Sequence, residues 1–193
     1  MGSALSREPL WAHLRVNTPH RTLILLGMNA TGKSSILQHL AKDSSSDVKY
    51  QTSTSDFCSE WLDLPNTSIK ILNCGSIHPG FKEQVQDYVR RHADGVILSL
   101  DAIASDDDWN DSMYILRHYI LDVKETKDCP LLVLINRCDE ERARSLTSIE
   151  QKVEPLLAER KGSTDRHCIK AINAKTGAGL DTSLDWLSQK LNS

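Results

Sequence analysis

Apolar and polar positions follow two different periods along this chain, and their alternation predicts strands and helices in turn. Short apolar runs at 22–26, 96–100 and 131–135 are typical of strands buried on both faces. Longer segments, such as 109–123 and 180–191, repeat apolar residues every three or four positions, which is typical of amphipathic helices. Strands that alternate with such helices predict an α/β domain with a mostly parallel central sheet and helices on both faces.

A hairpin interrupts this alternation near the middle of the chain. The apolar segments 57–64 and 69–72 flank Pro65-Asn66-Thr67-Ser68, a turn-forming sequence, so one antiparallel hairpin strand is expected in the sheet. The polar, serine-rich segment 42–51 is predicted to be a loop. The remaining expected elements are helices over 33–41, 81–89 and 149–157 and a strand over 168–172.

The size and charge of the chain narrow the classes of function. Its 193 residues suit one domain over 19–193 preceded by a short segment at 1–18. A net charge of −3 without a basic run argues against nucleic acid as a partner. No apolar stretch has the length of a membrane span, and no signal-peptide pattern is present. The five cysteines form no C-x-x-C pair, which favours reduced thiols in the cytoplasm.

Residues 27–34 match the phosphate-binding loop pattern G-x-x-x-x-G-K-[ST], between an apolar run and a helical segment. In this setting, backbone N–H groups and the helix dipole favour an anion at the helix N-terminus. Lys33 is expected to place its charge on the terminal phosphates, and the Ser34 hydroxyl to ligate magnesium. The expected nucleotide contacts in this loop are Gly27, Asn29, Ala30, Thr31, Gly32, Lys33, Ser34 and Ser35.

Two further polar loops, 136–139 and 173–175, each follow an apolar strand directly. Ligands bind beyond the carboxyl ends of the strands in open α/β sheets. Asp139 would accept hydrogen bonds from guanine donors, and adenine offers no donors at the same positions. Together with the phosphate loop, these loops resemble a small GTPase, in which N-K-x-D stands at 136–139. Arg137 replaces the lysine, and its plane is expected to lie over the base. The further expected contacts are Asn136, Arg137, Asp139, Ala174 and Lys175.

Motifs along nearly the whole chain resemble the Arf and Arf-like small GTPases. Residues 27–35 look like G-L-D-x-A-G-K-T-T, residues 54–57 look like the switch I sequence T-I-G-F, and residues 179–187 look like the closing G-L-x-x-x-L-x-W-L helix. The resemblance implies a P-loop NTPase fold with GTP or GDP and Mg²⁺ as cofactors. It makes Thr54 a nucleotide contact and the magnesium ligand beside Ser34. It also implies a monomer whose partners are effectors and exchange or activating proteins.

The N-terminus adds a membrane hypothesis. Its first six residues fit M-G-x-x-x-[ST], the pattern that exposes Gly2 for myristoylation. Leu10, Trp11 and Leu14 share one side of a short helix, which in Arf-like proteins moves to a membrane when GTP binds. One acyl chain anchors only marginally, so this amphipathic segment would be the second contact of a peripheral membrane protein. Two readings stay open: Met-Gly-Ser is common in expression tags, and Trp11 and Leu14 would equally pack on the body of the domain.

The family sequence W-D-V-G-G-Q is replaced by Leu-Asn-Cys-Gly-Ser-Ile at 72–77. Asn73 removes a negative charge from the outer shell of the magnesium ion. Ser76 keeps the backbone N–H that meets the γ-phosphate, although its Cβ restricts the backbone. Ile77 stands where the family has the glutamine that orients the attacking water. We therefore expect weak or absent intrinsic GTP hydrolysis, with charge stabilisation by Lys33 as the remaining catalytic contribution.

The leading hypothesis is a molecular switch that recruits effectors when GTP is bound, in intracellular transport at a membrane. A hydrolytically competent GTPase that needs an activating protein, a nucleotide-free scaffold and an ATP-dependent P-loop kinase are the alternatives, although no arginine-rich lid is present for a kinase. An apparent two-residue insertion between Ser76 and Gly80 leaves open whether His78 approaches the phosphate. The long segment between Ser34 and Thr54 leaves open whether Thr54 docks on magnesium.

Overall fold

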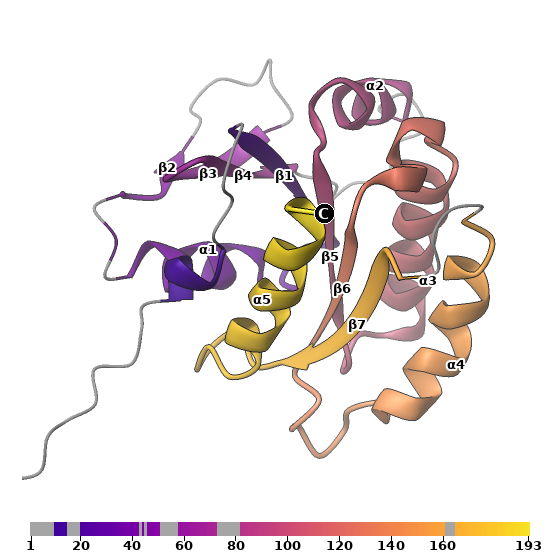
Figure 1. Cartoon of the computed structure of the whole chain (residues 1–193). Helices are drawn as coiled ribbons and strands as arrows, with labels where there is room; N and C mark the ends of the chain where they lie inside the picture. Colours follow the sequence, from indigo (N-terminus) through magenta and orange to yellow (C-terminus); the bar gives the residue numbers. More distant parts are fainter. Residues whose placement is uncertain are drawn as a thin grey trace, which may run out of the picture.

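The fold is built on a seven-stranded sheet with the strand order β2-β3-β4-β1-β5-β6-β7 (Figure 1). The computed structural model describes residues 10–14, 20–42, 44, 46–50, 58–72, 82–160 and 165–193. The strands are β1 (Arg21–Leu26), β2 (Lys49–Tyr50), β3 (Cys58–Leu64), β4 (Thr67–Leu72), β5 (Gly95–Asp101), β6 (Leu131–Asn136) and β7 (His167–Ile172). The helices are η1 (Leu10–His13), α1 (Lys33–Ala41), α2 (Lys82–His92), α3 (Asp106–Ile115), η3 (Leu116–Leu121), η4 (Lys124–Asp128), α4 (Leu146–Leu157) and α5 (Leu180–Leu191).

Strand directions confirm the expected, mostly parallel sheet. β1 pairs in parallel with β4 and β5, and the parallel arrangement continues through β6 to β7. β3 runs antiparallel to both β4 and β2, so it is the one strand that points against the others. The carboxyl ends of β1, β5, β6 and β7 therefore meet at one edge of the sheet.

Helices cover both faces of this sheet, as the sequence pattern predicts (Figure 1). Along β1, Leu23 and Leu25 belong to the apolar cluster that includes α1 and α5, whereas Ile24 and Leu26 belong to the cluster that includes α2, α3, η3 and α4. All four side chains are 0% exposed. A strand buried on both faces reads as a continuous apolar run, which explains the sequence of β1.

Three local features differ from the expectations. The hairpin turn contains only Pro65 and Asn66, and Thr67 and Ser68 already belong to β4. The predicted loop 42–51 contains the two-residue edge strand β2, which pairs with Trp61 and Glu60 of β3. Such a short strand leaves no periodic signal in a polar sequence. The expected helix over 109–123 begins three residues earlier and widens into the π-helical segment η3.

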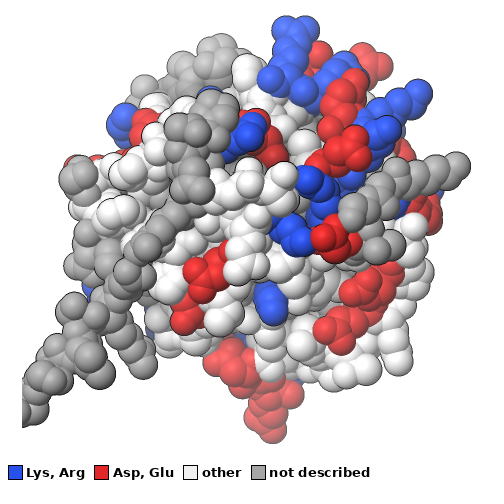
Figure 2. All heavy atoms as spheres, in the orientation of Figure 1, with Lys and Arg blue, Asp and Glu red and all other residues white. Residues whose placement is uncertain are grey.

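Three of the cysteines, Cys129, Cys138 and Cys168, are described as free thiols. Burial raises the pKa of each of these thiols above its ordinary value. They are therefore protonated near neutral pH. On the face shown in Figure 2, Lys and Arg side chains are interspersed with Asp and Glu side chains.

Candidate functional site

The loop between β1 and α1 has a backbone that requires glycine at both ends of the motif. Gly27 and Gly32 have φ angles of +147° and +99°. A Cβ on Gly27 would lie 2.4 Å from the carbonyl oxygen of Ser99, and one on Gly32 would lie 2.5 Å from Nδ2 of Asn136. Side chains at these positions would therefore clash with neighbouring strands as well as strain the backbone. The motif glycines allow the loop to lie close to β5 and β6.

The loop closes around the ammonium group of Lys33. The Lys33 side chain is buried, and its Nζ donates hydrogen bonds to the carbonyl oxygens of Gly27 at 2.9 Å and Met28 at 2.6 Å. The Thr31 hydroxyl donates to the same Met28 oxygen at 3.0 Å. α1 begins at Lys33, so its first N–H groups and its dipole add positive potential at the same place. A buried cation at a helix N-terminus suits the phosphate group of a ligand.

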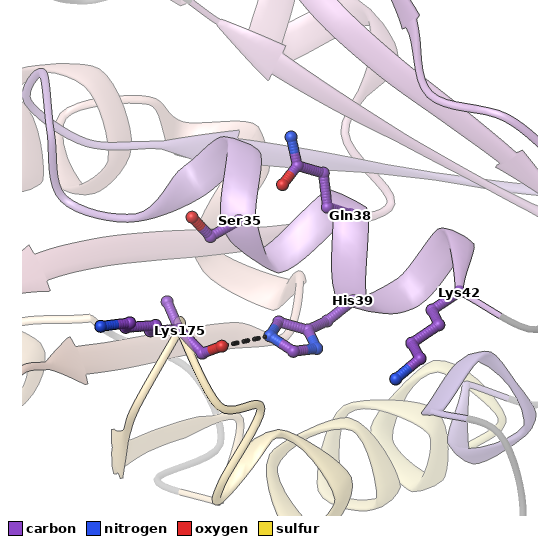
Figure 3. A pocket seen from close by; sticks show the side chains of 6 residues that line it. Ser35, Gln38, His39, Lys42 and Lys175 are labelled. Atoms are coloured by element: carbon purple, nitrogen blue, oxygen red, sulfur yellow. Dashed lines mark hydrogen bonds between the residues drawn. The ribbon is translucent and has the colours of Figure 1, made fainter.

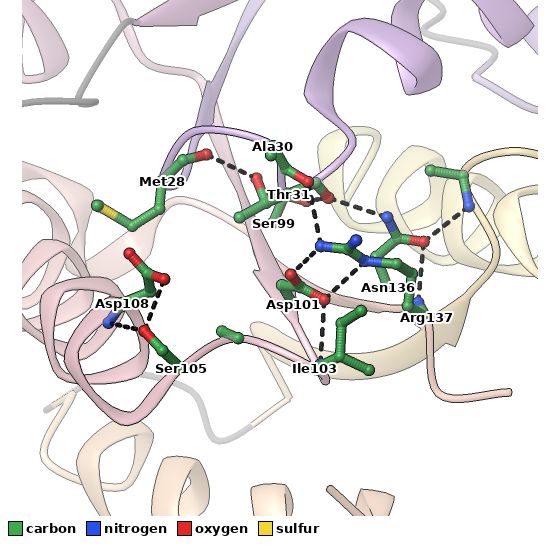
Figure 4. Close-up of polar contacts among 12 residues, drawn as sticks. Met28, Ala30, Thr31, Ser99, Asp101, Ile103, Ser105, Asp108, Asn136 and Arg137 are labelled. Carbon is green, nitrogen blue, oxygen red and sulfur yellow. Dashed lines mark hydrogen bonds and ion pairs between the residues drawn. The ribbon is translucent and has the colours of Figure 1, made fainter. Parts of the chain in front are cut away.

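Asn136 joins the three loops that the sequence singled out (Figure 4). Its side chain is buried, and its Nδ2 donates to the carbonyl oxygen of Thr31 at 3.1 Å. Its Oδ1 accepts from the backbone N–H groups of Arg137 at 3.0 Å and Ala174 at 2.9 Å. One amide group therefore fixes the relative positions of the phosphate loop, the 136–139 loop and the 173–175 loop.

Arg137 is held by an acid from the strand that lies between the phosphate loop and the 136–139 loop. Its φ angle is +64°, an uncommon value for a residue with a side chain. The guanidinium donates from Nε to Oδ1 of Asp101 at 2.8 Å and from Nη2 to Oδ2, and the same Nη2 reaches the Ala30 carbonyl at 3.4 Å (Figure 4). Asp101 is buried and ends β5. This paired, fork-like contact connects β5, the 136–139 loop and the phosphate loop.

The carboxylate of Asp139 is exposed but oriented. Its Oδ2 accepts a hydrogen bond from Nδ2 of Asn173 at 2.8 Å. Asn173 in turn accepts from the backbone N–H groups of Lys175 and Thr176, both at 3.0 Å. An acceptor that is both exposed and positioned suits recognition of a ligand with neighbouring donors, such as guanine.

A pocket of about 370 Å³ lies between α1 and the 173–175 loop (Figure 3). It is lined by Ser35, Gln38, His39, Lys42, Ala174 and Lys175. A ring nitrogen of His39 lies 3.0 Å from the carbonyl oxygen of Lys175, which ties the loop to the helix. The pocket therefore lies beside the first turns of α1 and the loop that follows β7.

The hydroxyl group expected to ligate magnesium has a carboxylate partner. Ser34 Oγ donates to Oε1 of Glu60 on β3 at 2.6 Å. Among the described residues, no group of three or more His, Cys, Asp or Glu side chains is arranged to hold a metal ion. Mg²⁺ usually binds through one or two protein groups together with phosphates and water. A hydroxyl beside a carboxylate, next to a phosphate loop, fits that mode of binding.

Several predicted site residues lie outside the described residues, namely Gly2, Thr54, Asn73, Ser76, Ile77 and His78. Conversely, Asp101 and Glu60 were not predicted as site residues. Asp101 had a signal, because it is an acid at the carboxyl end of a buried strand. The sequence also carried a signal for Glu60, because a charged residue is unexpected on the strand face that it shares with Leu62 and Leu64.

Comparison with known proteins agrees with this geometry. Residues 9–191 match the model of the ADP-ribosylation factor family. The chain belongs to the Arf family of small GTPases. ADP-ribosylation factor-like protein 15 of Mus musculus and that of Homo sapiens are each 28% identical over 143 residues. The matched segment covers 72% of this chain and 66% of each relative, just under two thirds of the relative's length.

The Arf-family fold is also found among solved structures. An ADP-ribosylation factor-like GTP-binding protein (small COPII coat GTPase SAR1) from Encephalitozoon cuniculi, solved in complex with GDP, superposes with a TM-score of 0.66. The superposition covers 94% of this chain and 83% of that protein, at 17% sequence identity. At this identity the likeness shows the small GTPase fold.

The N-terminal segment of this Arf-family chain packs on the body of the domain. Leu10 and Trp11 lie against the apolar cluster formed with α1 and α5, and Leu14 is 2% exposed. His13 Nδ1 lies 2.9 Å from Oδ1 of Asp185 on α5. In this structure, Trp11 and Leu14 thus pack on the body of the domain, which is one of the two readings that the sequence left open. None of the helices in the described ranges is long and apolar enough to cross a bilayer.

Proposed function

We propose that this Arf-family protein is a molecular switch that binds GTP or GDP with Mg²⁺ and recruits effector proteins when GTP is bound. The observation that carries the proposal is the set of hydrogen bonds in which Asn136 donates to Thr31 and accepts from Arg137 and Ala174. These bonds hold the phosphate loop near the oriented Asp139 carboxylate. Such an arrangement suits a nucleotide whose phosphates and base are bound at the same time.

The proposed nucleotide contacts divide the work of binding. Lys33 and the N–H groups at the start of α1 hold the phosphates, because both present positive charge to the loop. Asp139 accepts hydrogen bonds from the guanine edge, and Asn173 orients it. Ser34 and Thr54 hold magnesium, which when bound neutralises charge on the phosphates. The backbone N–H of Ser76 would contact the γ-phosphate, as the family sequence implies.

Hydrolysis of GTP is proposed to be weak or absent without another protein. Ile77 has no group that could orient an attacking water, whereas Lys33 retains its role in stabilising charge. An activating protein that supplies the missing group in trans is the second candidate for the hydrolytic step, as arginine fingers are in other GTPases.

The switch is proposed to act through the segment around Thr54 and through the N-terminus. Ordering of Thr54 on magnesium would change the surface beside the β3–β4 hairpin, where effectors would bind. Departure of Leu10, Trp11 and Leu14 from the body would expose an apolar surface for a membrane. Myristoylation of Gly2 would supply the first anchor of this peripheral association.

The test is calorimetric titration of the full chain with GDP, GTP and ATP in Mg²⁺, after mass spectrometry of any nucleotide that it releases. We expect GDP and GTP to bind and ATP to bind at least about a thousandfold more weakly, because adenine lacks the N1–H and the neighbouring exocyclic amine from which Asp139 would accept hydrogen bonds on guanine. Asp139→Asn should weaken GDP binding strongly, whereas Asp107→Asn, at an exposed position in α3, should not. Equal binding of ATP, or no binding of any nucleotide, would contradict the proposal, and the latter would favour a scaffold.

Single-turnover release of phosphate from bound GTP tests the hydrolytic part separately. We expect GTP to persist unless an activating protein is added, because Ile77 stands where the family has the glutamine that orients the attacking water. Rapid release without an activator would show a self-sufficient GTPase and would leave the binding proposal intact.

A further inference from the structure

Glu60 occupies an unusual position on the hairpin. It lies on the same face of β3 as Leu62 and Leu64, which are 0% and 5% exposed and pack in the cluster with α1. A carboxylate in a core-facing row costs free energy unless it is paired or hydrogen-bonded. Its presence there calls for a specific partner.

That partner is Ser34, the second residue of α1. The Ser34 hydroxyl donates its only proton to Oε1 of Glu60 at 2.6 Å, a short distance typical of a hydrogen bond to a charged acceptor. Because the proton is directed at Glu60, the hydroxyl lone pairs remain available to ligate a cation.

The backbone of β3 is shaped to present Glu60. The pairing of β3 with β4 shifts register between Cys58 and Glu60, where one residue is extra. Such a bulge changes the direction in which a side chain points and is frequent beside functional sites. On its other edge, Glu60 is paired with Tyr50 of β2, so neighbouring strands fix its position on both sides.

We infer that Glu60 is a positioning residue for the magnesium ion that accompanies the nucleotide. It orients the Ser34 hydroxyl toward the ion, and it brings one negative charge to within one hydrogen bond of the ligand. Outer groups that orient a metal ligand in this way raise both metal affinity and the precision of the site. The inference rests on the proposed function, because it presupposes a magnesium–nucleotide site at the phosphate loop.

In this arrangement Glu60 supplies negative charge near the metal. The Asn73 side chain is neutral and offers no such charge, whereas the Glu60 carboxylate accepts from the Ser34 hydroxyl. Because Glu60 belongs to the hairpin, a movement of β3 relative to α1 would change the magnesium affinity. The hydrogen bond between Ser34 and Glu60 would then link metal binding to the position of the hairpin.

The experiment measures how fast a fluorescent GDP analogue dissociates from the full chain as free Mg²⁺ is varied, with EDTA as the metal-free limit. The substitution Glu60→Gln keeps the shape of the side chain but removes its negative charge. The apparent dissociation constant for Mg²⁺ should rise by roughly tenfold, within the range known for outer-shell changes. The rate in EDTA should stay within about twofold of the parent rate, because the ammonium and base contacts are untouched. Glu83→Gln, at an exposed position in the first turn of α2, is the matched control and should behave as the parent.

Thermal unfolding of each variant precedes these measurements. If Glu60→Gln does not fold, Glu60→Asp serves instead, because it keeps the charge but withdraws the carboxylate from Ser34 by one methylene. This variant should weaken Mg²⁺ binding by at least about threefold.

Three results would overturn the inference. Unchanged Mg²⁺ affinity in the Glu60 variant would show that the hydrogen bond to Ser34 has no role in the metal site. Tighter Mg²⁺ binding would show that Glu60 competes with the metal for Ser34. An equal change of rate in Mg²⁺ and in EDTA would show a merely structural role. In all three results the parent still binds Mg²⁺ and GDP, whereas a parent that binds neither would remove the proposed function itself.

Discussion

The two sides of the candidate site are built differently. On the base side, Asn136, Arg137 and Asp101 connect loops that follow β1, β5, β6 and β7, which are neighbouring strands of one parallel sheet. On the metal side, Ser34 is connected by Glu60 to β3, the antiparallel strand of a hairpin. The base side can therefore stay fixed while the metal side follows the hairpin. Such a division suits a protein that must hold the same base in two nucleotide states.

The largest predicted effect tests the fixed side. Asn136→Ala removes the acceptor of the buried Ala174 N–H and one donor to the Thr31 carbonyl oxygen, which keeps its hydrogen bond from the Ser99 hydroxyl. We expect a loss of about 3 kcal/mol in the free energy of unfolding and roughly a hundredfold weaker GDP binding. Because Asn136 acts on the loops and not on the metal, the loss should be the same in Mg²⁺ and in EDTA. Urea unfolding and GDP titration measure the two quantities.

Asn192→Ala is the matched control for this prediction, because the Asn192 side chain donates to the Ser188 carbonyl oxygen at the C-terminal end of α5 and not to a loop of the site. It should change GDP affinity by less than about twofold. An Asn136 variant that binds GDP as well as the parent would show that the loops keep their positions without this amide, and the base side would no longer be the fixed side.

The base side, which we call the fixed side, was also easier to predict from the sequence than the metal side. Gly27 and Asn136 stand directly after apolar runs and open the loops that carry Lys33 and Asp139, and parallel strands bring such loops to one edge of a sheet. The strand order was not predictable in the same way. β5 lies between β1 and β6, so Asp101, at the end of β5, comes between the two predicted loops.

On the metal side, sequence alone gave the position of the hairpin but not its register. The direction of Glu60 depends on a bulge between Cys58 and Glu60, which comes from pairing with β4 and not from local preference. The short edge strand β2 was missed because two polar residues carry no period. Long-range pairing decides both features.

A smaller effect is expected at Arg137. Lysine at this position cannot form the paired contact with both oxygens of Asp101, although it is the residue that the family motif carries. We expect Arg137→Lys to speed GDP dissociation by roughly tenfold, equivalent to about one hydrogen bond to a charged group. Combined with Asp101→Asn, the two changes should be less than additive, because both remove the same contact. Tighter GDP binding by the lysine variant would show that the Asp101 contact draws Arg137 away from the base.

The smallest effect is predicted at the turn end of the hairpin. Hydrogen bonds from Ser68 and Lys49 hold the pKa of Asp63 below its usual value. A lowered pKa in the folded protein stabilises the fold at pH values above the usual pKa of aspartate, and this contribution is lost as the pH falls through the folded-state pKa. Both side chains of the Lys49 pair are well exposed, so Asp63→Asn should cost only about 0.5 kcal/mol at neutral pH. Unfolding measured from pH 7 down to pH 3 should show parent and variant converge.

The same variant sharpens the contrast between the two sides. Asp63 lies at the far end of β3 from Glu60 and on its opposite face, and its partner Ser68 belongs to the same hairpin. If the metal side depends on the contact between Glu60 and Ser34, Asp63→Asn should leave the Mg²⁺ dependence of GDP dissociation unchanged. A shift in that dependence would show that the hairpin transmits strain along its whole length. Its turn would then be part of the metal side, and the region that moves with the nucleotide state would extend over the hairpin as a whole.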